Sequence, residues 1–320
     1  MRRSYLLFLV LLLLSGCLLF SRIYQFQVEA PTSYSVHNIN TGLNYTTIQE
    51  AIDANETLDE NIILVDAGIY YEAVTVDKSI SLVGTDRNAA IIDGNFTIGD
   101  LVTVTVDNVK ISNLTIRNSN AGIQWLYPNL SNVVISNNII MNISSVGIST
   151  RSSGRILDNL MYNNSCCIST FWGYNLTITG NTLINSNMAL EFIYAGFINP
   201  DLPEPNYVWS NNFINNSRSL YDYGSITILN SDYPIGGNYW SEYNGTDMYS
   251  GPYQNESGSD GIADTPYIPD NNPYAMQHAV DYYPLMHPIP EFPSFLILPL
   301  FFITTLLAVI VYRRRHLTRA

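Results

Sequence analysis

The feature that most constrains the fold is an internal repeat in the middle of the chain. Six segments align without gaps, and most carry apolar residues at two fixed positions, with asparagine between and after them. They begin about 20 to 30 residues apart, a period typical of solenoid proteins. The segments are NVKISNLTIRN (108–118), NVVISNNIIMN (132–142), SGRILDNLMYN (153–163), NLTITGNTLIN (175–185), PNYVWSNNFIN (205–215) and DYPIGGNYWSE (232–242).

A third apolar column follows these segments, so each repeat offers three inward positions separated by polar bends, as in one turn of a triangular coil. Short runs of Ile, Val and Thr between Gly and Asn favour strands over helices. We therefore predict an all-β fold, a right-handed parallel β-helix, whose hand follows the rule for parallel crossovers. The three columns are Ile111, Ile135, Ile156, Ile178, Val208 and Ile235; Ile116, Ile140, Met161, Leu183, Phe213 and Trp240; and Ile123, Ile148, Ile168, Leu190 and Leu220.

Asparagine recurs at two positions of the repeat. It tolerates the left-handed backbone region, and its side-chain amide can pair with the next amide in a stack. We therefore predict two structural asparagine ladders along the coil. The first contains Asn138, Asn159, Asn181, Asn211 and Asn238, and the second contains Asn118, Asn142, Asn163, Asn185 and Asn215.

Both ends of the chain are hydrophobic. Residues 1–30 have a basic start, an apolar run and a small-residue ending, which is typical of a secretory signal peptide. An uncleaved anchor and lipidation at Cys17 are the open alternatives. Residues 295–312 are apolar and as a helix would measure about 27 Å, close to the roughly 30 Å of a bilayer core. The basic tail, residues 313–320, predicts a single transmembrane helix with a cytoplasmic C-terminus in the cell membrane.

Between these ends, residues 31–286 are predicted to form the extracellular β-helix, joined to the membrane span by a linker, residues 287–294. Within residues 45–58, Ile48, Ala51 and Ile52 share one face of a short amphipathic helix. We expect this helix to cap the first coil, because a terminal coil otherwise exposes apolar surface and unpaired strand edges. The Tyr-, Gly- and Asp-rich residues 237–286 are expected to cap the last coil.

The order TIQEAI, IILVDAGIYYEAVTVDKSISLVG and IIDG resembles the opening of the pectin-lyase-like β-helix superfamily, and the asparagine repeats resemble NosD-type β-helix proteins. The resemblance covers about residues 45–286. The tail of this region resembles archaeal surface proteins, and the Pro-Glu-Phe motif before the apolar run resembles PEF-type C-terminal sorting signals. These resemblances imply a surface protein whose C-terminal segment a transpeptidase removes, and NosD-type proteins imply a copper-accessory role.

The chain is acidic, with a formal net charge of −13. Half of its 14 basic residues lie in the terminal segments, whereas 26 of its 27 acidic residues lie between Pro31 and Ser294. A nucleic-acid partner is excluded on these grounds, because phosphate binding needs a basic face.

Catalytic chemistry is sparse in the repeats. Glycosidases use paired carboxylates, yet no two carboxylates fall in neighbouring coils of one column, and Glu191 is the best single acid. All four histidines lie outside the coils, so we predict no His-based metal centre or triad. A carbohydrate-active enzyme with a weakly marked site remains the alternative.

No cofactor is predicted, but two groups of side chains offer metal ligands. Asp260, Asp264 and Asp270 lie in a loop region where calcium could bind, but their spacing is unlike an EF-hand. Cys166 and Cys167 are soft ligands for copper, although buried thiols are the competing interpretation.

Aromatic side chains lie between the columns, and aromatic faces stack on sugar rings as readily as they pack in a core. Trp125, Trp172 and Tyr174 are the candidate ligand-binding residues. The leading prediction is a membrane-anchored β-helix that binds a polysaccharide or surface glycan, or serves as a structural surface component, without established catalysis. Of eleven Asn-x-Ser/Thr sequons between Pro31 and Ser294, those at Asn44 and Asn255 are the predicted glycosylation sites.

Overall fold

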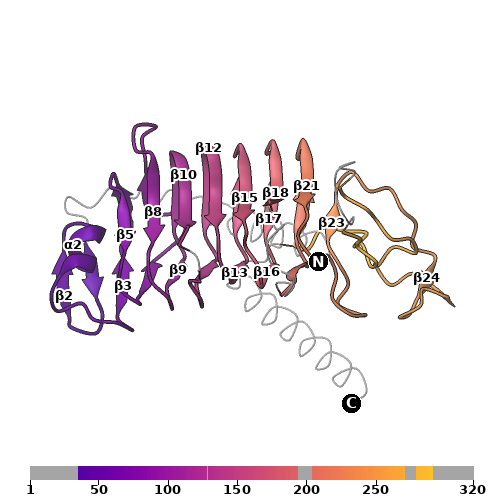
Figure 1. Cartoon of the computed structure of the whole chain (residues 1–320), viewed down its shortest axis with the longest axis horizontal. Helices are drawn as coiled ribbons and strands as arrows, with labels where there is room; N and C mark the ends of the chain where they lie inside the picture. The colour runs from indigo at the N-terminus through magenta and orange to yellow at the C-terminus, as the bar shows by residue number, and fades with distance from the viewer. Residues whose placement is uncertain (1–34, 128, 194–203, 271–278, 291–320) are drawn as a thin grey trace, which may run out of the picture.

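The computed structural model describes residues 35–127, 129–193, 204–270 and 279–290. The described residues form an all-β parallel solenoid. Its strands lie side by side along the long axis of the molecule, from the indigo N-terminal end to the orange C-terminal end (Figure 1). The predicted signal peptide and transmembrane helix lie outside the described residues. Within the described ranges no helix is long and apolar enough to cross a membrane.

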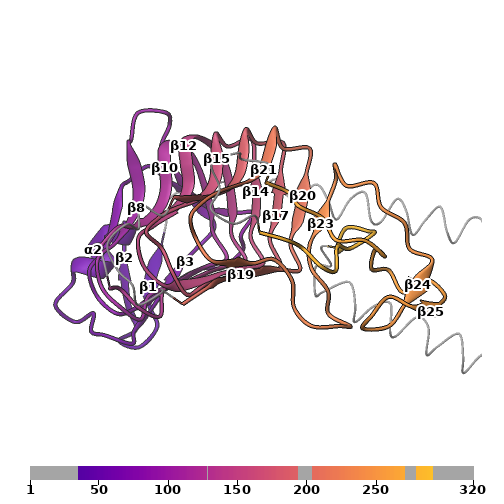
Figure 2. The same ribbon diagram turned by 45° about the vertical axis from the view of Figure 1, so that its right-hand side comes forward.

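One face of the solenoid is a 10-stranded sheet, seen along the lower side of the molecule in Figure 2, with β3 and β19 labelled. From β3 onward its neighbouring strands are parallel, whereas β1 pairs with β2 and β3 in antiparallel fashion. In order across the sheet its strands are β2 (Leu43–Tyr45), β1 (Val36–Asn38), β3 (Ile62–Val65), β6 (Ser81–Gly84), β9 (Lys110–Ser112), β11 (Val134–Ser136), β13 (Gly154–Leu157), β16 (Leu176–Thr179), β19 (Asn206–Trp209) and β22 (Thr227–Ile228).

The other two faces belong to one 13-stranded sheet, because the long strands β10 (Thr115–Trp125) and β12 (Ile139–Thr150) run through both. The second face adds β4 (Gly68–Tyr70), β7 (Ala90–Asp93), β14 (Leu160–Tyr162), β17 (Thr182–Ile184), β20 (Asn212–Ile214) and β23 (Tyr239–Trp240). The third face adds β5 (Val74–Val76), β8 (Asp100–Val104), β15 (Cys166–Phe171), β18 (Met188–Ile193) and β21 (Arg218–Tyr223).

The core consists of the three predicted columns. Ile140 pairs in register with Ile116 and Met161, and Ile168 pairs with Ile148 and Leu190. All six of these side chains are fully buried. Branched aliphatic side chains suit this interior because each coil packs its apolar residues directly on those of its neighbours.

The predicted first column is wrong at its last member. Ile235 is 57% exposed, and the coil after Val208 is instead filled by the fully buried Leu229. Strand β22 pairs Ile228 with Tyr207 of β19, and Leu229 directly follows this strand. Residues 230–237 form an insertion before the repeat resumes at Asn238. A gap-free alignment therefore assigned Ile235 to the column position that Leu229 occupies.

Both ends of the coil stack are capped. The predicted N-terminal helix is observed as α2 (Ile48–Asp53), with Thr47 as its N-cap and Ile48, Ala51 and Ile52 buried. At the other end Trp240 stacks on Phe213 of the preceding coil, with ring centroids 4.2 Å apart. The short antiparallel pair β24 (Tyr249–Ser250) and β25 (Glu256–Ser257) projects beyond this cap (Figure 2).

Candidate functional site

The first predicted asparagine series lies inside the coil and forms a continuous chain of hydrogen bonds, which we call the buried ladder (Asn138, Asn159, Asn181, Asn211 and Asn238). Each Nδ2 donates to Oδ1 of the next member at 2.9–3.1 Å. The same Oδ1 atoms accept the backbone N–H of the preceding member. Each Nδ2 also donates to a carbonyl of the first-column strand one coil earlier. Every amide group in the ladder is therefore satisfied.

A carboxylate terminates the buried ladder, and sequence reasoning missed it. Asp281 Oδ2 accepts the backbone N–H of Asn238 at 2.8 Å and the indole Nε1–H of Trp240 at 2.8 Å. Burial raises the pKa of Asp281 to about 6, although these hydrogen bonds act in the opposite direction. Asp281 lies outside the repeat, so no column could have placed it here.

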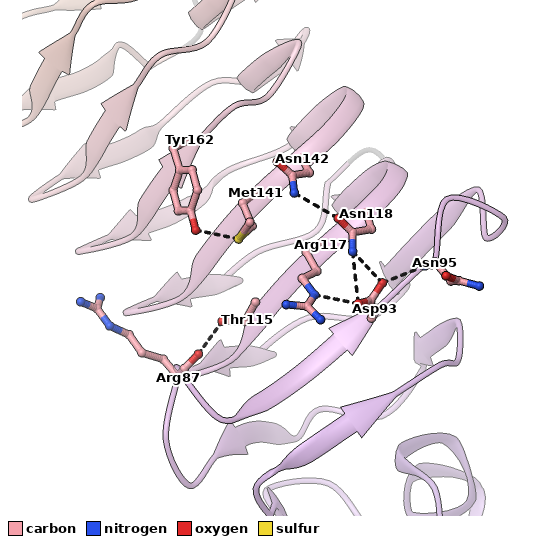
Figure 3. Close-up of polar contacts among 9 residues, drawn as sticks. All are labelled: Arg87, Asp93, Asn95, Thr115, Arg117, Asn118, Met141, Asn142 and Tyr162. Carbon is pink, nitrogen blue, oxygen red and sulfur yellow. Dashed lines mark hydrogen bonds and ion pairs between the residues drawn. The ribbon is translucent and has the colours of Figure 1, made fainter. Parts of the chain in front are cut away.

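The second predicted series, the outer series (Asn118, Asn142, Asn163, Asn185 and Asn215), occupies a corner of the coil. All five members have a positive φ, between 51° and 58°, the conformation that asparagine tolerates. Figure 3 shows that Asn142 donates to Asn118 and that Asn118 donates to Asp93. Among the described residues these are the only side-chain bonds along the series, and Asn163, Asn185 and Asn215 are exposed.

The prediction that this whole series forms a ladder is therefore wrong beyond its first two members. The side chain that points into the coil is that of the residue after each member of the outer series. Ile143 N–H donates to Asn164 Oδ1, Asn164 N–H to Ser186 Oγ, and Ser186 N–H to Asn216 Oδ1. The left-handed residue turns its own side chain outward and directs the next one inward.

Asp93 is the counterpart of Asp281 at the start of the outer series. Its Oδ2 accepts from Arg117 Nε at 2.7 Å, and its Oδ1 accepts the backbone N–H of Asn95 at 2.8 Å (Figure 3). Burial alone would raise the pKa of Asp93, but the Asn95 N–H, the Arg117 guanidinium and the Asn118 amide together hold the pKa below its usual value.

The candidate acid Glu191 lies on β18 and is partly exposed. Its Oε2 accepts a hydrogen bond from Ser169 Oγ at 2.7 Å, and its neighbours in the adjacent coils are Ser169 and Tyr221. No second carboxylate stands beside it in this row. Within this row of described residues, Glu191 therefore has no neighbouring carboxylate with which to form the pair that glycoside hydrolysis uses.

A pair of carboxylates does occur elsewhere, at Asp222 and Asp270. The Asp222 backbone N–H donates to Asp270 Oδ2, and Arg218 pairs with Asp270 Oδ1 at 2.9 Å. Both acids are about 1% exposed. The Asp222 carboxylate accepts from Ser225 and Thr227. Through these contacts Asp270 joins the C-terminal region, residues 237–286, to the solenoid. Because both carboxylates are buried, they are inaccessible to a polymeric substrate.

The carboxylates of the three calcium candidates accept hydrogen bonds from groups of the protein itself. Asp260 accepts from Gly251 and Ile262 N–H, and Asp264 accepts from Met248 and Tyr249 N–H, whereas Asp270 lies apart with Arg218. Across the part of the chain that the structure describes, no group of three or more His, Cys, Asp or Glu side chains gathers as a metal site.

The copper candidates Cys166 and Cys167 are free, buried thiols. Cys167 Sγ lies 3.2 Å from Ser186 Oγ, and Cys166 Sγ lies 3.4 Å from the Ile168 carbonyl oxygen. Burial raises the pKa of Cys167 to about 11 and raises the pKa of Cys166 well above its usual value. Because metals bind the thiolate, this environment opposes metal binding.

Of the three aromatic candidates, Trp125 is misassigned. It is 0% exposed, at the end of β10, and its ring lies where a Cβ on Gly154 would approach it within 3.2 Å. The sequence placed Trp125 in a segment between the apolar columns, but it is the last residue of an 11-residue strand and its side chain lies in the core.

Trp172 and Tyr174 instead line a small cleft together with Asn129 and Arg151, which we call the aromatic cleft. It has a volume of about 170 Å³. Trp172 is 49% exposed and its ring centroid lies 5.1 Å from that of Phe171. The Arg151 guanidinium carbon lies 5.3 Å from the Phe171 ring centroid. An apolar face beside a guanidinium and an amide suits a sugar ring, which offers both C–H faces and hydroxyl groups.

The backbone conformation of Trp172 also marks the aromatic cleft as a candidate ligand-binding site. Its φ is 68°, which is unusual for a bulky side chain and is normally found for Gly, Asn or Asp. Such strain persists where the surrounding structure enforces it, often at ligand-binding sites.

The glycosylation candidates Asn44 and Asn255 are both exposed. The Asn44 amide oxygen is hydrogen-bonded to the His37 ring. Asn255 directly precedes β25 in the C-terminal tail and makes no side-chain hydrogen bond with the described residues.

The fold and cleft define a class, a parallel β-solenoid with a small cleft lined by aromatic side chains. No family model matches the chain. A relative, the cell surface glycoprotein of Methanothermus fervidus, is 37% identical over 107 residues, which are 33% of this chain and 17% of that protein. Similar solved structures include pectin methylesterase PemA from Erwinia chrysanthemi, with 14% identity, a TM-score of 0.43 and coverage of 69% of this chain and 70% of that one. A pectin methylesterase in complex with a hexasaccharide has 12% identity, a TM-score of 0.40 and coverage of 63% and 86%.

Proposed function

We propose that this protein is a cell-surface β-helix protein that binds a glycan at the aromatic cleft and does not cleave it. The observation that carries the proposal is Trp172, a half-exposed indole in a left-handed backbone conformation that lines the cleft with Tyr174 and Arg151. The name of the Methanothermus relative supports a surface location.

The proposed topology places the β-helix outside the cell. The apolar run 295–312 followed by a basic tail supports a C-terminal membrane anchor, and residues 1–30 support export. The resemblance to PEF-type signals extends this proposal to processing of the C-terminal segment. Accessibility of the β-helix to protease added to whole cells tests the topology, and full protection would refute it.

Binding without cleavage is favoured by the arrangement of acids. Glu191 has no carboxylate partner in its row, and the Asp222 and Asp270 carboxylates are buried. A glycosidase needs two accessible carboxylates roughly 5 to 9.5 Å apart. A carbohydrate-active enzyme is the alternative that the test below separates.

The test is a glycan array combined with a reducing-sugar assay on the full chain. Trp172→Gly is the informative variant, because glycine relieves the positive φ while removing the indole. Tyr253→Ala is the matched control, since Tyr253 is 84% exposed and lies in the C-terminal tail. We expect Trp172→Gly to lose at least tenfold in affinity and the control to bind like wild type. Sugar release that Glu191→Gln abolishes would make the protein an enzyme and refute the proposal.

A further inference from the structure

We infer that Asn129 carries an N-linked glycan and that the first sugars of this glycan lie in the aromatic cleft, against Trp172. The inference rests on the proposed function in one respect, that the cleft accepts sugar. It goes further by naming the occupant, which is a glycan of the chain itself.

The attachment point forms part of the cleft. Asn129 begins the sequon Asn129-Leu130-Ser131 and is one of the four residues that line the aromatic cleft. It lies between β10 and β11, is exposed, and has a φ of 71°. Its side-chain amide makes no hydrogen bond with the described residues, so Nδ2 is available for modification. A sugar on Nδ2 would therefore start at the wall of the cleft.

The size and lining of the cleft suit such an occupant. Its volume of about 170 Å³ is below the roughly 300 to 1,000 Å³ of pockets that enclose a whole ligand. A cleft of this size holds part of a chain, and a tethered glycan needs no more than that. Trp172 and Tyr174 supply aromatic faces and Arg151 supplies hydrogen-bond donors. Tethering raises the local sugar concentration to the millimolar range expected of short linkers, so weak stacking suffices for occupancy.

The covalent step is a glycosyl transfer without redox change. The donor class is a lipid-linked oligosaccharide phosphate, and the catalyst is a separate membrane transferase of the exporting cell. A bond forms between Asn129 Nδ2 and the anomeric carbon, while the bond from this carbon to the phosphate oxygen breaks. The lipid phosphate leaves, and one amide proton passes to a base of the transferase.

Other sequons differ in a way that supplies controls. Asn142 in β12 donates a hydrogen bond from Nδ2 to Asn118 Oδ1 in β10, so this amide is occupied in the folded protein. Asn255 is exposed in the C-terminal tail and does not line the cleft. A glycan on Asn255 would therefore leave the surroundings of Trp172 unchanged.

The experiment uses the full chain purified from a host that carries out N-glycosylation. Glycopeptide mass spectrometry measures occupancy at Asn129, and acrylamide quenching of tryptophan fluorescence measures shielding of Trp172. We compare wild type with Asn129→Gln, with Ser131→Ala, which removes the sequon but keeps the Asn129 side chain, and with Asn255→Gln. Trp172→Gly identifies the part of the fluorescence that belongs to Trp172.

We expect most Asn129 peptides to carry glycan, and we expect a roughly twofold rise in quenching of the Trp172 signal in both sequon variants but not in Asn255→Gln. An unmodified Asn129 peptide overturns the inference. Modification without a change in quenching also overturns it, because the glycan then lies outside the cleft. The proposed function fails separately, if unglycosylated protein from a bacterial host binds no sugar on the array.

Discussion

The two asparagine series recur with the same period, yet their side chains differ in burial and in hydrogen bonding. The buried ladder, Asn138 to Asn238, lies inside the coil, and each of its amides is bonded to both neighbouring coils or to a terminal acid. The outer series, Asn118 to Asn215, lies on a corner, and its side-chain bonds stop after Asn142.

The difference follows from the cost of desolvation. A buried amide without partners costs about 1–3 kcal/mol per unsatisfied group, so the interior ladder must be complete. An exposed amide is satisfied by water, and asparagine is then selected for its left-handed φ. Each chain of side-chain hydrogen bonds ends in a carboxylate, which in its ionised form only accepts hydrogen bonds. This carboxylate is Asp281 for the buried ladder and Asp93 for the outer series.

The largest effect is expected for Asn181→Leu, in the middle of the buried ladder. The change removes Asn181 Oδ1, which accepts from the backbone N–H and from Nδ2 of Asn159, and removes Asn181 Nδ2, which donates to the Ile156 carbonyl. We expect a loss of roughly 3 to 9 kcal/mol in unfolding free energy, at about 1–3 kcal/mol for each of these three buried groups. Denaturant unfolding measures it, with Asn185→Leu as the control, which should lose only about 1–2 kcal/mol from its left-handed φ. Equal losses would mean that the two series are equivalent.

A pH-dependent effect is expected at Asp281. Because burial raises its pKa to about 6 in the folded state, above the ordinary value of 3.8, protonation stabilises the fold. This stability is present below about pH 4 and is lost as pH rises through 6. The variant Asp281→Asn keeps an acceptor for Asn238 and lacks the buried charge. We therefore expect its stability relative to wild type to rise between pH 4 and 7, measured by thermal unfolding. A constant difference would show that Asp281 does not titrate in this range.

Asp93 should show the opposite sign. Its pKa is lowered in the folded state, so its contribution to stability is present above the ordinary aspartate pKa and is lost as pH falls through the folded value. Asp93→Asn should be less stable than wild type at pH 7, and the difference should shrink towards pH 3. Acid unfolding of the two proteins side by side measures it. A difference that grows in acid would contradict the assigned contacts.

The smallest effect is expected for Asn185→Gly. The φ of Asn185 is 51°, which glycine adopts at no steric cost, and the side chain is exposed. We expect a change within about 0.5 kcal/mol, as for surface substitutions that break no special contact. A loss above 2 kcal/mol in the same denaturant assay would reveal a ladder bond at this corner.

The sequence was most informative where the repeat is regular. Columns through Ile140 and Ile168 and the buried ladder could be predicted because one residue per coil must fill the same space. Two predictions from the sequence were wrong. Ile235 is exposed because an insertion interrupts the coil there, and at the left-handed corner the side chain of Asn164, not that of Asn163, points inward.

The candidate site was harder to predict than the fold. Trp125 and Trp172 look alike in the sequence, but strand length decides that one is core and the other is exposed. Asp281 and Asp270 reach their partners through tertiary contacts outside the repeat, and Asn129 lines the cleft from a segment between two repeats, so no periodicity encodes these positions.

The central claim is that one asparagine series is a closed interior ladder and the other faces water. Hydrogen exchange of the side-chain amides, followed by nuclear magnetic resonance on protein labelled with ¹⁵N-asparagine, tests it most directly. We predict strong protection of the Nδ2 protons of Asn159, Asn181 and Asn211 and rapid exchange at Asn163, Asn185 and Asn215. Similar exchange rates in the two groups would contradict the account.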